Sequence, residues 1–210
     1  MEIQHHFSSP IWLYQKPDFI KSCIKCTDPY IKIARKRNAK LIKQTNDFGL
    51  SHHSTGLLAD HSFQDLKYYI GTTAWRFLDA QGYDLKVYKL FMSELWVQEF
   101  SLNGGGHQQE HVHPNDHVSG FYFLKCGPDT SYPIFNDPRN GASTTKLKRK
   151  EETVLGLGSE QITFRPIPGT IMLFNSFLPH QFAVDPGKKP FRFIHFNVRA
   201  VNEEMAKHAL

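Results

Sequence analysis

The second half of the chain constrains the fold most, because from about Tyr88 onward its pattern is that of short strands separated by turns. Apolar residues form short or alternating runs, and Gly, Pro, Asn and Asp separate these runs. The expected strands cover residues 95–102, 108–113, 118–124, 161–164, 170–174, 181–184 and 191–200, with a short earlier strand at 11–14. So many antiparallel strands in one region indicate a double-sheet arrangement.

The first half of the chain has a helical pattern instead. A stretch that opens at Pro17 carries apolar residues on one side, and Asp28 and Pro29 are expected to restart the helix as its cap and first residue. A second helix is expected over residues 62–82. The predicted fold class is therefore mainly β with N-terminal helices, a double-stranded β-helix or jelly roll that the helices brace on one side.

The length of 210 residues predicts a single domain, with a helical part over about 1–85 and a jelly-roll core over about 86–200. Three cysteines fit a reducing compartment, and no apolar run is long enough to span a membrane. We expect a cytoplasmic protein from a bacterium or from a phage in its host. The net charge of +5 is mild, so neither a nucleic-acid partner nor a membrane is expected.

Histidines on two of the expected strands are the candidate metal ligands. His111 and His113 are two residues apart, and side chains at that spacing share one side of a strand. His180 follows a proline near the start of another strand. A metal that performs chemistry needs about three protein ligands and open positions for substrate. These histidines therefore predict a metal site at the mouth of the barrel.

Arg192 is the one cation in the mainly apolar run 190–198, about twelve residues beyond His180. A charge in such a strand is costly unless it is paired. A bound carboxylate would pair with the planar guanidinium through two parallel hydrogen bonds. The sequence thus predicts an anion site near the histidines.

Taken in order, four runs resemble the iron(II)- and 2-oxoglutarate-dependent oxygenases, a bacterial and phage branch in particular and the prolyl hydroxylases more distantly. These runs are His111-Val-His-Pro-Asn115, Ser119-Gly-Phe-Tyr-Phe-Leu124, Pro168 to His180 and Arg192 to Asn197. The resemblance covers about residues 95–200. It implies Fe(II) and 2-oxoglutarate as cofactors and an enzyme that hydroxylates a substrate by oxidative decarboxylation of 2-oxoglutarate. It also implies metal binding by His111, His113 and His180, and cosubstrate binding by Arg192, Ser119 and Phe123.

Two departures from the family pattern leave alternatives open. His113 stands where the family places a carboxylate, so the metal face is three histidines, or Asp116 or Asp137 reaches in, or His111 and His180 bind alone. Prolyl hydroxylases tend to have a tyrosine at the position of Phe123, which strand alternation places on the side of Ser119. Tyr122 then points the other way.

Two further functions remain open beside the oxygenase. One is a cupin-like three-histidine metalloprotein that does not use 2-oxoglutarate, in which case Arg192 belongs to a structural ion pair. The other is a non-catalytic jelly-roll module that binds a sugar or serves as a structural part. The sequence does not distinguish a peptide, a nucleotide or a metabolite as the prime substrate, and it leaves the oligomeric state open. A long polar insert at 127–159 is expected to be a loop that covers the substrate.

Overall fold

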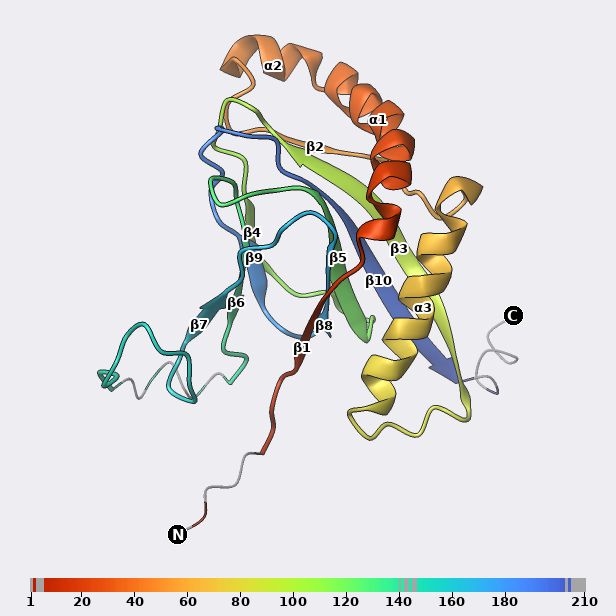
Figure 1. The fold of residues 1–210 in the computed structure, drawn as a ribbon, viewed down its shortest axis with the longest axis vertical. Helices are drawn as coiled ribbons and strands as arrows, with labels where there is room; N and C mark the ends of the chain where they lie inside the picture. The colour runs from red at the N-terminus through yellow and green to blue at the C-terminus, as the bar shows by residue number, and fades with distance from the viewer. Residues whose placement is uncertain are drawn as a thin grey trace.

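The computed structural model describes residues 2, 6–139, 141, 144, 147–202 and 204. Their strands form a six-stranded sheet in the order β1-β8-β5-β10-β3-β2 and a four-stranded sheet in the order β4-β9-β6-β7 (Figure 1). The strands of the larger sheet are β1 (Ile11–Gln15), β2 (Ser51–His53), β3 (Tyr88–Phe100), β5 (Val118–Lys125), β8 (Thr170–Asn175) and β10 (Arg192–Asn202). The smaller sheet consists of β4 (Gln108–His111), β6 (Pro133–Asn136), β7 (Gln161–Thr163) and β9 (His180–Phe182). The predicted jelly-roll class is confirmed.

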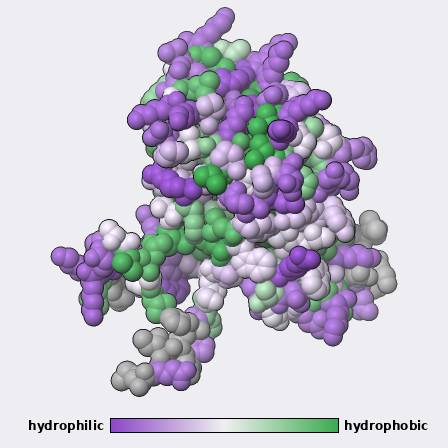
Figure 2. All heavy atoms as spheres, viewed as in Figure 1, coloured by the Kyte–Doolittle hydropathy of each residue, from purple (hydrophilic) through white to green (hydrophobic). Residues whose placement is uncertain are grey.

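Helices α1 (Ile20–Arg37) and α3 (Gln64–Asp79) cover one face of the six-stranded sheet, and α2 (Ala39–Thr45) follows α1 at the upper end of the molecule (Figure 1). Ile31 of α1 and Ile70 and Phe77 of α3 are buried in the core between the helices and the sheet. The hydrophilic residues of α1 and α2 project from the upper end of the molecule (Figure 2). Among the described residues, no helix has the length and apolar character to cross a membrane.

Strand β10 separates two cores, because its side chains alternate between the two sides of the sheet. Ile194 and Phe196 belong to the core under the helices, while Phe193 belongs to the core between the sheets. Gly120 on the neighbouring β5 permits close packing, since a Cβ there would lie 2.2 Å from the carbonyl oxygen of Met172. The inter-sheet core is unusually rich in phenylalanine and contains Phe100, Phe121, Phe123, Phe135, Phe174, Phe182, Phe191 and Phe193.

The predicted restart of the first helix is wrong, because α1 runs without a break and has Pro29 inside it. Proline removes one backbone donor from a helix. The hydroxyl of Thr27, two residues earlier, donates to the carbonyl of Cys23 at 2.7 Å and so adds a side-chain donor to this part of the helix. The second helix exists as predicted, but a 3-10 turn at His61–Phe63 precedes it, and Asp60 caps that turn.

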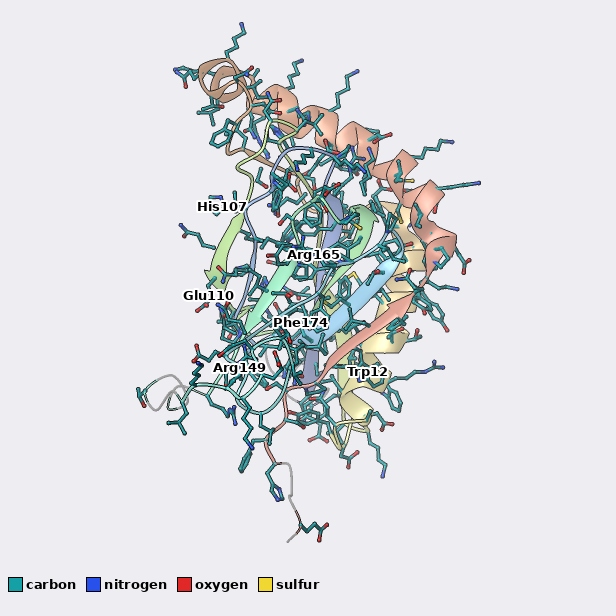
Figure 3. The ribbon with its side chains drawn as sticks, turned by 60° about the vertical axis from the view of Figure 1, so that its left-hand side comes forward. Trp12, His107, Glu110, Arg149, Arg165 and Phe174 are labelled. Atoms are coloured by element: carbon teal, nitrogen blue, oxygen red, sulfur yellow. The ribbon has the colours of Figure 1, made fainter. Side chains whose placement is uncertain are left out.

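The insert predicted over 127–159 is not a loop throughout. It contains β6, which pairs with both β7 and β9. Beyond β6 the chain forms an arm that projects from the smaller sheet, with Arg149 at its base (Figures 1 and 3). Residues 140, 142, 143, 145 and 146 of this arm lie outside the described residues. The role of the insert as a substrate cover stays a prediction.

Candidate metal centre

Strand pairing brings the three predicted histidines together. His111 at the end of β4 is the direct partner of His180 at the start of β9, and their ring centroids are 4.4 Å apart. His113 follows two residues after β4, with its ring 5.0 Å from that of His111 and 5.2 Å from that of His180. One nitrogen from each ring lies within 4.8 Å of the other two. The three rings thus form a group of the size that one metal ion requires.

Burial keeps two of these imidazoles neutral. It lowers the pKa of His180 to about 3, although the hydrogen bond from its Nδ1 to the carbonyl of Leu178 at 2.9 Å opposes the shift. Burial, followed by the charge of His111, lowers the pKa of His113 to about 4. The Nε2 atoms of His113 and His180 are buried without a hydrogen-bond partner. Neutral imidazoles are what iron accepts as ligands, so the group fits iron.

A second group of possible ligands adjoins the first and shares His113. It consists of Glu94, His113 and His195, with one ligand atom from each within 4.8 Å of the others. Burial lowers the pKa of His195 well below its ordinary value, and neither of its ring nitrogens has a hydrogen-bond partner, although Nε2 lies 3.9 Å from Glu94 Oε2. Its ring lies 4.6 Å from that of His113 and 4.4 Å from that of Trp96.

Sequence reasoning did not include His195, Glu94 or Asn197 in the site. Strand alternation could have found two of them. His195 and Asn197 are three and five residues after Arg192 in β10, and both point to the side opposite that arginine. Glu94 is the register partner of Asn197 on β3, a relation that the sequence does not reveal.

Polar side chains from three strands and a loop join into one network behind His113. Asn197 Nδ2 is 2.9 Å from Glu94 Oε2 and 3.1 Å from His113 Nδ1. The hydroxyl of Ser119 donates to Asn197 Oδ1 at 2.6 Å and lies 2.9 Å from the hydroxyl of Ser176. Ser119, predicted to contact the cosubstrate, therefore lies near the metal group and already has two protein partners.

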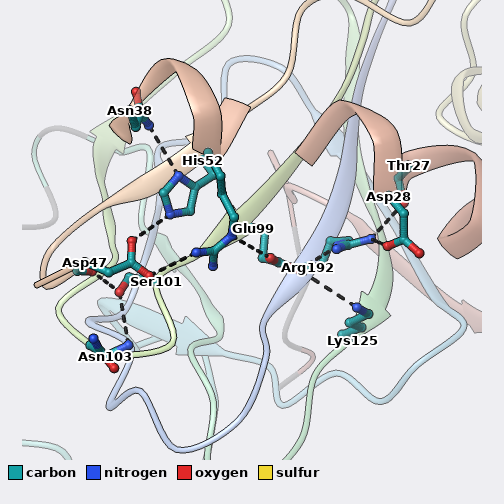
Figure 4. A network of polar contacts seen from close by, with 11 residues as sticks. Thr27, Asp28, Asn38, Asp47, His52, Glu99, Ser101, Asn103, Lys125 and Arg192 are labelled. Carbon is teal, nitrogen blue, oxygen red and sulfur yellow. Dashed lines mark hydrogen bonds and ion pairs between the residues drawn. The ribbon is translucent and has the colours of Figure 1, made fainter. Parts of the chain in front are cut away.

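Arg192 lies on the other side of β10, under α1 (Figure 4). Its Nε donates to Glu99 at 2.7 Å, and its Nη1 is paired with Asp28 and contacts the hydroxyl of Thr27 at 3.2 Å. Among the described residues, Arg192 is the only buried arginine or lysine. Glu99 and Asp28 compensate the buried charge of Arg192. The predicted contact between Arg192 and 2-oxoglutarate therefore has no support in this arrangement.

The remaining predicted residues take different positions. Phe123 is fully buried between the sheets, and Tyr122 points to the helix side, where its hydroxyl donates to the carbonyl of Lys16 at 2.7 Å. Asp116 is held by Ser93 and Arg199, and Asp137 by Arg139. Neither aspartate belongs to a group of possible metal ligands among the described residues.

A cavity of about 620 Å³ opens beside His113. Its wall includes Leu78, Tyr83, Tyr88, Val112 and Phe177. Carboxylates at Asp84 and Asp116 also line it. Strand β4 lies at the outside of the molecule, with His107 near one end of the strand and Glu110 near the other (Figure 3). Of the three histidines, His113 lines this cavity, whose surface is mainly apolar and aromatic.

Residues 94–197 match a family model described as "Putative 2OG-Fe(II) oxygenase", which confirms the resemblance found in the sequence. Among curated proteins, none matches the chain.

The fold matches three solved structures over most of their length. AviO1 from Streptomyces viridochromogenes is 10% identical, with a TM-score of 0.57 over 91% of this chain and 90% of its own. The viral collagen prolyl hydroxylase of Paramecium Bursaria Chlorella virus-1 is 12% identical, with a TM-score of 0.55 over 96% and 98%. A Pseudomonas putida prolyl-4-hydroxylase is 13% identical, with a TM-score of 0.54 over 91% and 94%. The chain spans 54% and 57% of the length of two further solved structures that it matches.

Proposed function

We propose that this protein is an iron(II)- and 2-oxoglutarate-dependent dioxygenase that hydroxylates an organic substrate. The proposal starts from a jelly-roll core that matches the 2OG-Fe(II) oxygenase family over residues 94–197. The observation that supports this most is the group of three histidines. His111, His113 and His180 converge from β4, its following loop and β9, at the positions that carry the resemblance to the family.

His111 and His180 are placed to hold iron through Nε2. The Nδ1 atom of each lies near a backbone carbonyl, that of Gln109 at 2.7 Å and that of Leu178 at 2.9 Å. Such a contact fixes the orientation of a ligating imidazole and increases its basicity. Bound iron(II) supplies the oxidising chemistry of this family, in which 2-oxoglutarate is decarboxylated together with hydroxylation of the prime substrate. The role of the protein is to orient the ligands and to exclude water.

The aromatic surroundings of His180 exclude water from the centre. Its ring lies 4.7 Å from that of Phe174 and 5.8 Å from that of Phe121. In such surroundings an electrostatic contact is stronger than in water. The prime substrate would enter through the cavity beside His113, whose apolar walls and two carboxylates favour an apolar or cationic molecule over an anionic one.

Anaerobic titration with Fe(II), followed by 2-oxoglutarate, tests the proposal. We expect one iron per chain, a charge-transfer absorbance on addition of 2-oxoglutarate, and slow formation of succinate when oxygen is admitted. His180→Ala should abolish all three signals, whereas His107→Ala should leave them unchanged. His107 is the matched control because it lies just before β4, is exposed and belongs to neither ligand group. A parent protein that binds no iron would overturn the proposal.

One observation favours a second candidate, a three-histidine metalloprotein that does not use 2-oxoglutarate. Arg192 is occupied by Glu99 and Asp28, and none of the described arginines or lysines is buried with the histidines. The same titration separates the two functions. Iron binding without any spectral change or succinate formation in the presence of 2-oxoglutarate would favour this second candidate.

A further inference from the structure

The hydrogen bonds of the three histidines differ in kind. His111 Nδ1 and His180 Nδ1 each face a backbone carbonyl oxygen, which only accepts hydrogen bonds. Both Nδ1 atoms must therefore carry the proton, and the lone pair is left on Nε2. The amide nitrogen of Gln108, 3.5 Å from His111 Nε2, is a donor and agrees with this assignment. In these two rings Nδ1 is protonated and Nε2 is free to bind a metal, as in a ligating histidine.

His113 has the opposite environment, because its Nδ1 faces the amide nitrogen of Asn197 at 3.1 Å. The orientation of this amide follows from Glu94. A carboxylate accepts hydrogen bonds and does not donate them, so the atom of Asn197 that lies 2.9 Å from Glu94 Oε2 must be the nitrogen. Its second N–H then points to His113 Nδ1, while Asn197 Oδ1 accepts from Ser119.

The consequence for His113 follows from the chemistry of a neutral imidazole, in which one nitrogen donates and the other accepts. Because Nδ1 of His113 accepts from Asn197, its proton lies on Nε2, which is buried without a protein partner. A protonated nitrogen has no lone pair for a metal ion. The residue at the third ligand position is therefore prepared to donate a hydrogen bond.

We propose that Glu94, acting through Asn197, holds His113 as an Nε2–H donor beside the metal, so that His111 and His180 are the only protein ligands among the three histidines. This assignment rests on the proposed function for the presence of the metal. It leaves an additional coordination position open to a ligand from solution. The Nε2–H of His113 favours a ligand with an acceptor oxygen, such as a carboxylate. Asn197 and Glu94 are positioning residues, because they act through His113.

Imidazole ¹H–¹⁵N correlation spectra of the metal-free protein at neutral pH test the assignment directly. We expect Nδ1–H tautomers for His111 and His180 and the Nε2–H tautomer for His113. In Glu94→Gln, the amide of the new glutamine can donate a hydrogen bond. The Asn197 amide can then rotate by 180°, so that its Oδ1 accepts from the glutamine and faces His113 Nδ1. We therefore expect His113 to change to the Nδ1–H tautomer. Glu110→Gln is the matched control, since Glu110 also accepts from an asparagine amide, that of Asn136, and that pair does not contact His113. An Nδ1–H tautomer of His113 in the parent would overturn the proposal.

Cobalt(II) titration supplies a second readout. His111→Ala and His180→Ala should each weaken cobalt binding at least about a hundredfold, whereas His113→Ala should weaken it less than about tenfold. Glu94→Gln should tighten it about tenfold, because His113 can then join as a third ligand. Equal losses for His113→Ala and His111→Ala would overturn the proposal. A parent that binds no cobalt would instead overturn the proposed function, and the tautomers of the metal-free protein would still decide the state of His113.

Discussion

Two buried polar clusters lie on opposite sides of β10, and they differ in how completely their polar atoms are paired. On the helix side, Arg192 is bonded to Glu99, Asp28 and Thr27. Between the sheets, the cluster of His113, His180 and His195 has four ring nitrogens that are buried without a partner. We call these the arginine cluster and the histidine cluster.

This difference distinguishes a structural cluster from a functional one. An unpaired buried polar atom costs free energy, and most such atoms in folded proteins find partners. In the arginine cluster, partners within the chain offset the cost of burying the charge of Arg192, so no further partner is needed. In the histidine cluster the buried ring nitrogens lack hydrogen-bond partners, and a metal ion with its other ligands would offset that cost. Removing a member of each cluster should therefore have unequal effects on stability.

The largest effect is expected for Arg192→Leu. The substitution leaves Glu99, with a side chain only 8% exposed, with the longer contacts to Arg35 at 3.5 Å and Lys125 at 4.0 Å. Breaking a buried pair costs about 3–5 kcal/mol when the remaining charge has no partner, so we expect a loss of about 3 kcal/mol of unfolding free energy, measured by urea denaturation. Iron and 2-oxoglutarate affinities of the folded protein should not change. The double variant Arg192→Leu/Glu99→Leu should recover most of the loss. Full stability with weakened 2-oxoglutarate binding would instead assign Arg192 to the cosubstrate.

His180→Phe should change the stability much less. The new ring would lie among Phe121, Phe135 and Phe174, and the unpaired Nε2 atom would be gone. The hydrogen bond from Nδ1 to the Leu178 carbonyl would also be lost, so we expect the two effects to offset each other and the metal-free variant to stay within about 1 kcal/mol of the parent. Its cobalt affinity should fall at least about a hundredfold, which corresponds to about 2.7 kcal/mol. Urea denaturation and cobalt titration measure the two quantities. Retained cobalt binding would remove His180 from the metal site.

Acid should destabilise the metal-free protein through the histidine cluster. The pKa values of His113 and His180 in the folded state, about 4 and about 3, lie below the value of about 6.5 expected for an unfolded chain. Below pH 6.5 the unfolded state therefore binds more protons, and the free energy of unfolding falls as the pH falls toward 4 and 3. Each histidine contributes a slope of at most about 1.4 kcal/mol per pH unit.

The matched control for this slope is His180→Phe, which should lower it by the contribution of one histidine. Above pH 6.5 neither residue contributes, because both states are then neutral. Urea denaturation at several pH values between 4 and 8 measures the effect. An unchanged slope in the variant would show that His180 does not titrate differently in the two states.

The sequence predicts the fold class from local pattern, because apolar runs bounded by turn residues indicate β5, β8 and β10. Alternation places His111 and His113 on one side and correctly turns Tyr122 away from Phe123, whereas the inclusion of His180 depends on the family resemblance. The short strands were harder. β2 has three residues, and β6 lies inside a polar insert, so neither produces a periodic signal.

The partner of Arg192 could not be predicted, because it depends on the position of a helix. A costly cation in an apolar strand indicated a partner, but Asp28 comes from α1 and Glu99 from the neighbouring strand. Asp28 was interpreted as a helix cap next to Pro29, which hid its role as an ion-pair partner. Long-range pairings of this kind depend on packing, whereas alternation within β10 separates Arg192 from His195 of the same strand and from no residue of another strand.

The smallest effect is expected for Tyr122→Phe on the helix side of β5. The hydroxyl of Tyr122 donates to the Lys16 carbonyl at 2.7 Å, which ties β5 to the segment before α1. Loss of one neutral hydrogen bond costs about 1 kcal/mol, and the ring itself is retained. Cobalt and 2-oxoglutarate affinities should match those of the parent, because the hydroxyl is on the opposite side of the sheet from the histidine cluster. Urea denaturation measures the stability, and a change in cobalt affinity would contradict the separation of the two sides.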